Sequence, residues 1–153
     1  FPGVTEKGLQ VTRLYEVQGA DGKWYPAPQE LRVGDVVRVT LTCAKMADEL
    51  EYLVVEDYLP ACMEAINPNV PSQAVDLEPC EWSMSFDHKE YLPDRVRAFC
   101  TRWAHRDLLN MRYYARVKRA GSCTAPPAHA QLMYEPQTYG LSPNAKLISR
   151  PAP

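Results

Sequence analysis

The alternation of apolar and polar side chains between Leu31 and Cys43 constrains the fold of this chain more than any other feature. After a turn at Gly34 and Asp35, an apolar series alternates with a polar one: Val37, Val39, Leu41 and Cys43 against Arg38, Thr40 and Thr42. Only an extended chain places these two series on opposite faces. We therefore predict a half-buried β-strand here.

Several other segments alternate in the same way, namely Gly8–Val17, Leu50–Tyr58, Arg95–Trp103 and Met111–Val117. We predict that Leu50–Tyr58 is the antiparallel partner of Leu31–Cys43 and that Arg95–Trp103 is a central strand. Trp24 and Tyr25 complete a first hairpin at a sheet edge, and Arg13 interrupts the apolar face of its first strand. With 14 prolines and no segment of helical period, the chain is predicted to be an all-β, antiparallel β-sandwich.

Length and composition indicate one globular domain. The 153 residues contain 46% apolar and 24% charged side chains, and we assign residues 1–140 to this domain. Residues 141–153 are rich in Ser, Pro, Asn and Lys, so we expect a flexible C-terminal tail. The chain begins at Phe1 without a signal-peptide pattern, and we interpret it as a processed product or a domain cut from a longer protein.

Charge and hydropathy exclude two classes of partner. A net charge of -2 gives no broad cationic surface for nucleic acid. No apolar segment approaches the length of a membrane span, so we expect no direct membrane insertion by this domain.

Five cysteines are spread evenly along the chain, at Cys43, Cys62, Cys80, Cys100 and Cys123. The sequence has no CxxC motif and no Cys/His cluster, so it does not predict a zinc site. One or two disulfides in an oxidising compartment are therefore favoured over none. The alternative is that several are small buried apolar side chains. Cys43 and Cys100 fall on predicted inward faces and are the more core-like. The sequence does not assign the pairs.

Motifs for catalysis are not found. His88, His105 and His129 have no ligand spacing, and Glu56–Asp57 fits a charged strand end better than a cation site. No nucleophile elbow or phosphate-binding loop occurs. We therefore predict no enzyme activity, no cofactor and no metal.

The segment Asn110–Pro136 retains the strongest functional signal. In its strand, inward side chains alternate with outward ones: Met111, Tyr113, Ala115 and Val117 against Arg112, Tyr114 and Arg116. Pro126 and Pro127 predict an edge strand or bend that presents Leu132, Met133 and Tyr134 near a surface. These last side chains either form an interaction surface or close the sandwich, and the residues alone leave both options open.

Several motifs together resemble one family. LRVGDVVRVTLT (Leu31–Thr42), LEYLVVEDYLPACMEAINP (Leu50–Pro68), FDHKEYLPDRVRAF (Phe86–Phe99) and MRYYARVKRAGSCTAPPAHAQLMYEP (Met111–Pro136) are similar to the C-terminal macroglobulin domain of bacterial α2-macroglobulins. The resemblance covers nearly all of Gly8 to Gly140. The fold it implies is a macroglobulin-like, fibronectin-III-like sandwich. The set of five cysteines is not expected of this family.

The resemblance implies a domain of a broad-spectrum protease inhibitor of bacterial defence, in the periplasm and often anchored to the inner membrane as a lipoprotein. Such a domain packs on other macroglobulin domains and on a thioester domain of the same chain, which it shields until protease cleavage triggers the trap. The shielding Met-Tyr pair maps onto Met133 and Tyr134. Proteases are the targets of the whole protein, and a peptidoglycan-synthesis protein is a further partner to consider.

An adhesin or surface-protein repeat is the alternative, with a purely structural or interaction role. GDVVRVTLT followed by VVEDYLPA also resembles the strand pair of such modules. This alternative predicts tandem copies upstream and no helical thioester domain.

Overall fold

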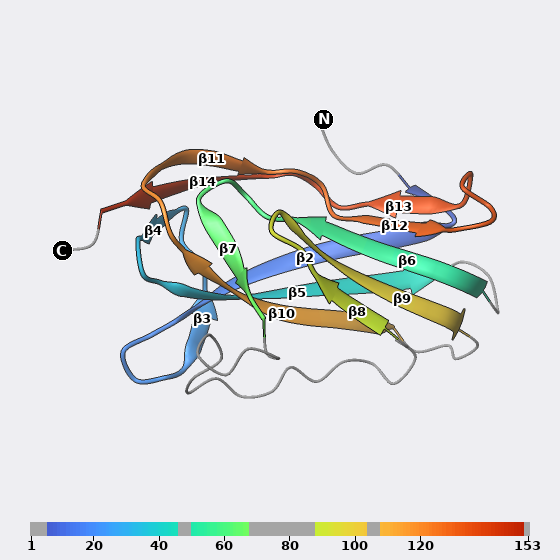
Figure 1. The fold of residues 1–153 in the computed structure, drawn as a ribbon, viewed down its shortest axis with the longest axis horizontal. Helices are drawn as coiled ribbons and strands as arrows, with labels where there is room; N and C mark the ends of the chain where they lie inside the picture. Colours follow the sequence, from blue (N-terminus) through green and yellow to red (C-terminus); the bar gives the residue numbers. More distant parts are fainter. Residues whose placement is uncertain (1–5, 46–49, 68–87, 104–107, 152–153) are drawn as a thin grey trace.

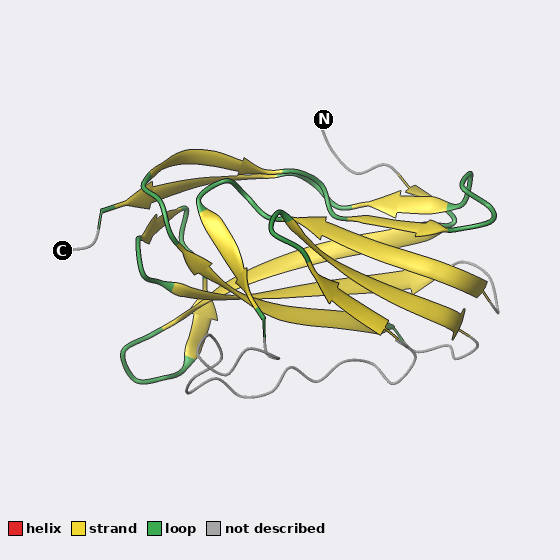
Figure 2. Ribbon diagram, viewed as in Figure 1, coloured by secondary structure: helices red, strands yellow, loops and turns green. Residues whose placement is uncertain are grey.

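The computed structural model describes residues 6–45, 50–67, 88–103 and 108–151. Within these residues, the chain forms strands and no helix (Figures 1 and 2). Two large sheets pack face to face, and a small third sheet, β11-β14-β4, lies at the end where the chain terminates (Figure 1). The all-β sandwich predicted from the sequence is confirmed, and all but one of the strand pairings are antiparallel. No helix in the described part is long and apolar enough to span a membrane.

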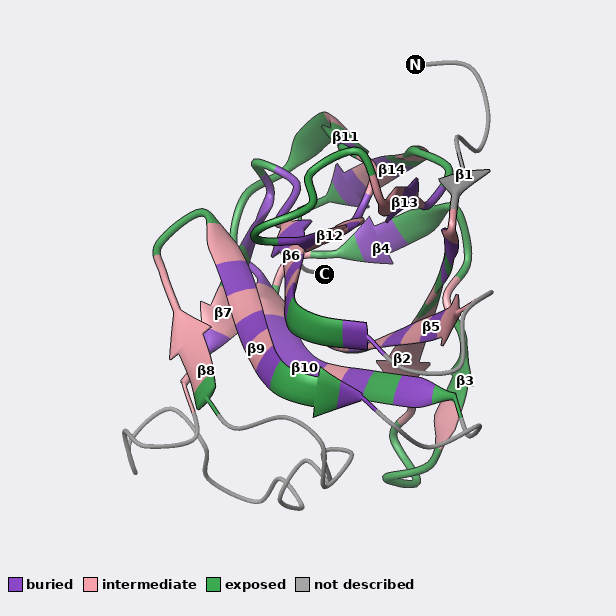
Figure 3. Ribbon diagram, turned by 90° about the vertical axis from the view of Figure 1, so that its right-hand side faces the viewer, coloured by how far each residue is buried: buried purple, intermediate pink, exposed green. Residues whose placement is uncertain are grey.

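The five-stranded sheet has the order β3-β2-β5-β10-β7. Its strands are β2 (Leu9–Gln18), β3 (Trp24–Pro26), β5 (Val36–Lys45), β7 (Met63–Ile66) and β10 (Leu109–Val117). The alternation that predicted β5 and β10 is visible as alternating burial, and the inward side chains of both strands are inaccessible to solvent (Figure 3). The first hairpin lies at the sheet edge, as predicted.

The six-stranded sheet has the order β1-β13-β12-β6-β9-β8. Its strands are β1 (Glu6–Lys7), β6 (Leu50–Tyr58), β8 (His88–Tyr91), β9 (Arg95–Trp103), β12 (His129–Leu132) and β13 (Tyr139–Leu141). The prediction that Leu50–Tyr58 pairs with the preceding strand is therefore wrong, because β5 pairs with β2 and β10 while β6 pairs with β12 and β9. The apolar faces of β5 and β6 belong to opposite sheets, which period-2 alternation cannot distinguish from neighbours in one sheet.

The prolines predicted an edge strand or a bend, and the position of β12 excludes the first of these options. It lies between β13 and β6, so it is an interior strand. Pro126 and Pro127 precede the strand, and their missing N–H groups therefore do not interrupt its ladder.

The C-terminal segment is not a flexible tail throughout, as residues 141–153 were expected to be. Ala145–Arg150 form β14, which pairs with β11 (Gly121–Ala125) and, in parallel, with β4 (Glu30–Arg32). Leu147 is buried, and the burial of its apolar side chain stabilises the strand although the surrounding residues are polar. Gly140 is a packing position before β14, since a Cβ there would lie 2.5 Å from the carbonyl oxygen of Leu9.

A buried ion pair joins the two large sheets. The Arg13 guanidinium on β2 donates to the Asp57 carboxylate on β6 at 2.6 Å, and both side chains are almost fully buried. The Tyr113 hydroxyl on β10 donates to the same carboxylate at 2.5 Å. Arg13 also donates to the backbone carbonyl oxygens of Ala125, Pro126 and Pro143. The arginine that interrupts the apolar face is thus satisfied inside the core, as a buried charge must be.

The cysteines divide into two groups. Cys62 and Cys123 form a disulfide with a Cα–Cα distance of 6.3 Å, which links the segment before β7 to β11. Cys43 and Cys100 are both buried, in agreement with their predicted inward positions. Cys80 lies outside the described residues.

Loss of the buried ion pair is expected to destabilise the domain strongly. The substitution Arg13→Met should lower the free energy of unfolding by about 3–5 kcal/mol, because the Asp57 carboxylate remains buried without its partner. Urea unfolding measures this loss. Arg150→Met, which breaks an exposed pair with Glu30, is the control and should have little effect. Equal losses in both variants would contradict the importance of burial.

Removal of the disulfide gives a second stability prediction. The bond closes a sequence separation of 61 residues, and its loss should lower the free energy of unfolding by about 2–4 kcal/mol. Cys62→Ala, Cys123→Ala and the double variant should lose the same amount in urea unfolding, because each substitution breaks the same bond. A double variant much less stable than either single variant would show that the two cysteines act separately.

Candidate functional site

The turn between β12 and β13 carries the two side chains that the resemblance singled out. It lies at the opposite end of the sandwich from the β11-β14-β4 sheet (Figure 1). Three backbone hydrogen bonds fix it, from Leu132 N–H to Thr138 O, from Glu135 N–H to Leu132 O and from Thr138 N–H to Glu135 O. The turn is therefore an ordered extension of the sheet.

Leu132, Met133 and Tyr134 do not share one environment. Leu132 is buried and closes the core, whereas Met133 is 48% exposed and Tyr134 is 74% exposed. Both exposed side chains present apolar surface to solvent at the end of the domain. Of the two options that the sequence left open, core closure applies to Leu132 alone.

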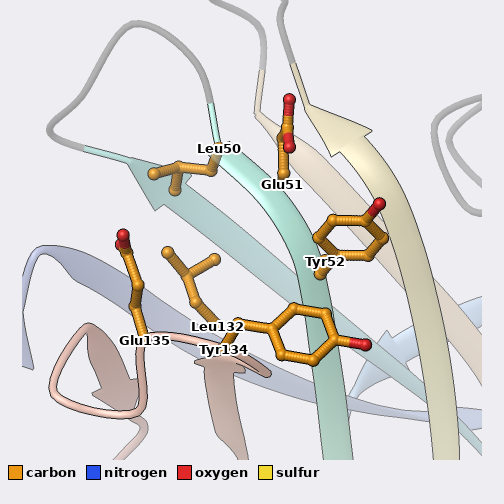
Figure 4. Close-up of a pocket in the computed structure, with 6 residues that line it drawn as sticks. All are labelled: Leu50, Glu51, Tyr52, Leu132, Tyr134 and Glu135. Carbon is orange, nitrogen blue, oxygen red and sulfur yellow. The ribbon is translucent and has the colours of Figure 1, made fainter.

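Strand β6 supports the turn from one side. The Met133 N–H donates to the carbonyl oxygen of Tyr52 at 2.8 Å. The rings of Tyr52 and Tyr134 meet edge to face, with centroids 5.0 Å apart and an interplanar angle of 83°. Beside them lies a surface groove of about 580 Å³, which is lined by Leu50, Glu51, Tyr52, Leu132, Tyr134 and Glu135 (Figure 4).

The described lining of the groove is suited to contact with another surface. It combines aromatic rings, leucines and two carboxylates, and none of these described lining residues is a cysteine, histidine or serine. Across the described residues, no group of three His, Cys, Asp or Glu side chains could hold a metal ion. Tyr134 and Met133 offer a phenol ring and a flexible thioether, which are side chains that protein interfaces favour.

The predicted outward residues of β10 do not join this site. Tyr114, expected to be exposed, is buried and stacks on Trp24 with ring centroids 5.5 Å apart. Arg112 donates to the Thr40 hydroxyl and Arg116 to the Gly34 carbonyl oxygen. Trp24 on the edge strand β3 covers Tyr114. The alternation of residues in β10 does not predict this contact.

The titratable groups weighed in the sequence also lie elsewhere. Glu56 and Asp57 lie near the end of β6, where Asp57 is fully buried against Arg13 and Glu56 pairs with Arg95. His129 lies on β12, where burial lowers the pKa of its imidazole and Glu56 opposes this shift. His88 lies on β8, and His105 is outside the described residues.

Tyr52 is the site residue that the sequence reasoning missed. A signal for it exists, because the alternation of β6 breaks there: Leu50 and Leu53 are both buried, whereas Glu51 and Tyr52 are both exposed. Two apolar residues three positions apart within an otherwise alternating strand indicate such a break.

Comparison with protein families gives one match that covers most of the chain. Residues 8–137 match the model of the bacterial alpha-2-macroglobulin MG10 domain. A comparison with curated protein sequences gave no match.

Solved structures agree with this match. Native α2-macroglobulin from Escherichia coli, spanning domain MG7 to the C-terminus, is 27% identical with a TM-score of 0.79, over 99% of this chain and 25% of that one. The native conformation of the E. coli protein by electron cryo-microscopy is 27% identical with a TM-score of 0.81, over 99% and 10% of the two chains. The trypsin-activated E. coli protein is 26% identical with a TM-score of 0.78, over 98% and 11%. The present chain thus spans a quarter or less of these relatives.

The buried thiol of Cys43 should be chemically inert in the folded protein. Burial raises its pKa to about 12, so the reactive thiolate is absent at neutral pH. Iodoacetamide labelling followed by peptide mass spectrometry should find Cys43 unmodified in the native protein and modified in urea. Modification at equal rates in both conditions would contradict its placement in the core.

Proposed function

This chain belongs to the family of bacterial alpha-2-macroglobulin MG10 domains, and from this premise we propose that it is the C-terminal domain of a broad-spectrum protease inhibitor. In this proposal, the domain catalyses no reaction. It packs on the other macroglobulin domains and on the thioester domain of its own chain, and it shields the thioester until a protease cleaves the parent protein. The family match favours this function over an adhesin or surface-protein repeat.

The exposure of Met133 and Tyr134 is the observation that carries the proposal. Both are large apolar side chains, and they sit together on a turn that hydrogen bonds hold to the sheet. Exposed apolar groups on an ordered support favour contact with another protein surface. We call Met133 and Tyr134 the gate.

The chemistry of a thioester explains why such a gate would use these two residues. Water hydrolyses a thioester, so a covering surface has to exclude water. A phenol ring and a thioether provide apolar cover, and neither forms a bond with the acyl carbon at neutral pH. Since the gate stands on a turn outside the domain core, a movement of the domain would uncover the thioester without unfolding the sandwich.

The disulfide supports a location for the parent protein. Cys62–Cys123 joins two buried or half-buried positions, and such bonds persist in oxidising compartments such as the bacterial periplasm. We therefore propose that the parent lies in the periplasm, and the family resemblance implies in addition that it is a lipoprotein anchored to the inner membrane. A peptidoglycan-synthesis protein is a further partner within this proposal.

Removal of the gate in the full-length parent tests this function. Met133→Gly together with Tyr134→Gly should accelerate the reaction of the thioester with methylamine at least tenfold, because water and small amines then reach the acyl carbon. The measurement is the rate at which the thioester thiol is released, followed with a thiol reagent. Buried Cys43 should contribute no background in the native protein.

Tyr25→Gly is the matched control, since Tyr25 is an exposed tyrosine on β3, in the other large sheet. This variant should react at the rate of the unmodified protein. If the double glycine variant also reacted at that rate, the gate assignment would be wrong. A parent that incorporates no methylamine by mass spectrometry, even when unfolded, would contradict the presence of a thioester.

A further inference from the structure

We propose that Tyr52 is a positioning residue that holds the gate in its closed geometry, a role that rests on the function proposed above. Tyr52 lies on β6, about 80 residues before the gate in the chain, and the family resemblance assigns it no role although it falls within the motif LEYLVVEDYLPACMEAINP. Its backbone and its ring each contact one residue of the gate. Three features of the structure support this role.

The backbone of Tyr52 is the first feature. Its φ angle is +57°, and within the described residues it is the one non-glycine residue with a positive φ. This left-handed conformation is unfavourable for a bulky L-residue. Strained residues of this kind persist where surrounding contacts over-determine them, and they cluster at functional sites. Tyr52 therefore has this conformation for a reason other than local preference.

The second feature is what this conformation does to β6. Leu53 and Val55 point into the core, so regular alternation would also send Glu51 inward and Leu50 outward. The opposite is observed, because Leu50 is buried and Glu51 is exposed. The left-handed residue thus returns Leu50 to the core while the Tyr52 ring stays on the surface beside the turn (Figure 4).

The alternation of buried and exposed residues in the neighbouring strand β9 breaks at the residues that pair with this part of β6. Cys100 and Trp103 are buried while Thr101 and Arg102 between them are exposed, and Trp103 pairs with Leu50. The shift is therefore shared by two paired strands. A local irregularity of one residue would not require its partner strand to follow.

The contacts of Tyr52 are the third feature. The regular pairing of β12 with β6 ends at Leu132 and Leu53, and the hydrogen bond from Met133 N–H to Tyr52 O extends it by one residue. The ring of Tyr52 then meets the ring of Tyr134 edge to face. One residue thus fixes the backbone of Met133 and the side chain of Tyr134.

Burial shows that this ring contact does not serve the core. Tyr52 is 44% exposed and Tyr134 is 74% exposed. A side chain as exposed as Tyr134 would otherwise sample several rotamers. The edge-to-face contact favours one of them, so the ring is in place before the thioester domain meets it.

The experiment uses the full-length parent and the rate of thiol release by methylamine. Tyr52→Asn removes the ring while asparagine tolerates the left-handed backbone, and it should accelerate the reaction about threefold to tenfold. Tyr52→Phe keeps the ring and should restore the slow reaction. Tyr25→Asn, which removes a tyrosine of similar exposure elsewhere, should leave the rate unchanged.

A double variant separates positioning from a general loss of structure. If Tyr52 acts through the gate, Tyr52→Asn combined with Tyr134→Gly should react no faster than Tyr134→Gly alone. Multiplied rate increases would overturn the inference, because the two residues would then act independently. The urea concentration at the midpoint of unfolding should be the same in Tyr52→Asn as in the unmodified protein, which would show that the fold is intact. A large fall in this midpoint, together with a Tyr52→Phe variant that does not restore the slow reaction, would assign Tyr52 a structural role instead.

The failure of each proposal gives a different result. A fast Tyr134→Gly variant with a Tyr52→Asn variant at the unmodified rate would overturn the role of Tyr52 and leave the gate in place. Both variants at the unmodified rate would overturn the gate, and with it the positioning role.

Discussion

The buried ion pair between Arg13 and Asp57 is the interaction on which the rest of the structure depends. It joins β2 in one sheet to β6 in the other, and Tyr113 from β10 completes the carboxylate's hydrogen bonds. A charge pair removed from water is stable only when nearly all its hydrogen-bonding groups are satisfied. Arg13 meets this condition by also binding carbonyl oxygens of the segment that leads into β12. The core thereby fixes the path of the strand that carries the gate.

Met133 and Tyr134 lie outside that core, and this separation fits the proposed gate, which requires a domain that is stable and can also be displaced. Leu132 ends β12 inside the sandwich, and the next two side chains emerge from it. The support for them is local and comes from Tyr52 on β6. A rigid scaffold with a surface contact at one end can move as a body, so in the proposed function the contacts at the turn would break without unfolding of the sandwich.

Much of the fold was predictable because period 2 is a strong signal, as in Val37–Cys43 and Met111–Val117. Alternation indicates on which face of a strand a side chain lies, but not which strand is its neighbour. The predicted partner of β6 was therefore wrong. The sequence marks Arg13 as an interruption, but its partner Asp57 is 44 residues away and only the topology brings them together. The same holds for Cys62 and Cys123. The role of Met133 and Tyr134 stays a prediction from the family resemblance, while Tyr52 depends on a backbone angle that propensities do not predict.

The most direct test of the central claim is a structure of the native full-length parent. The account predicts that the thioester domain of the same chain lies against the turn between β12 and β13, with the side chains of Met133 and Tyr134 over the thioester and the Tyr52 ring still against Tyr134. A native structure in which this turn faces solvent, or contacts a different domain while the thioester is covered by other residues, would contradict it.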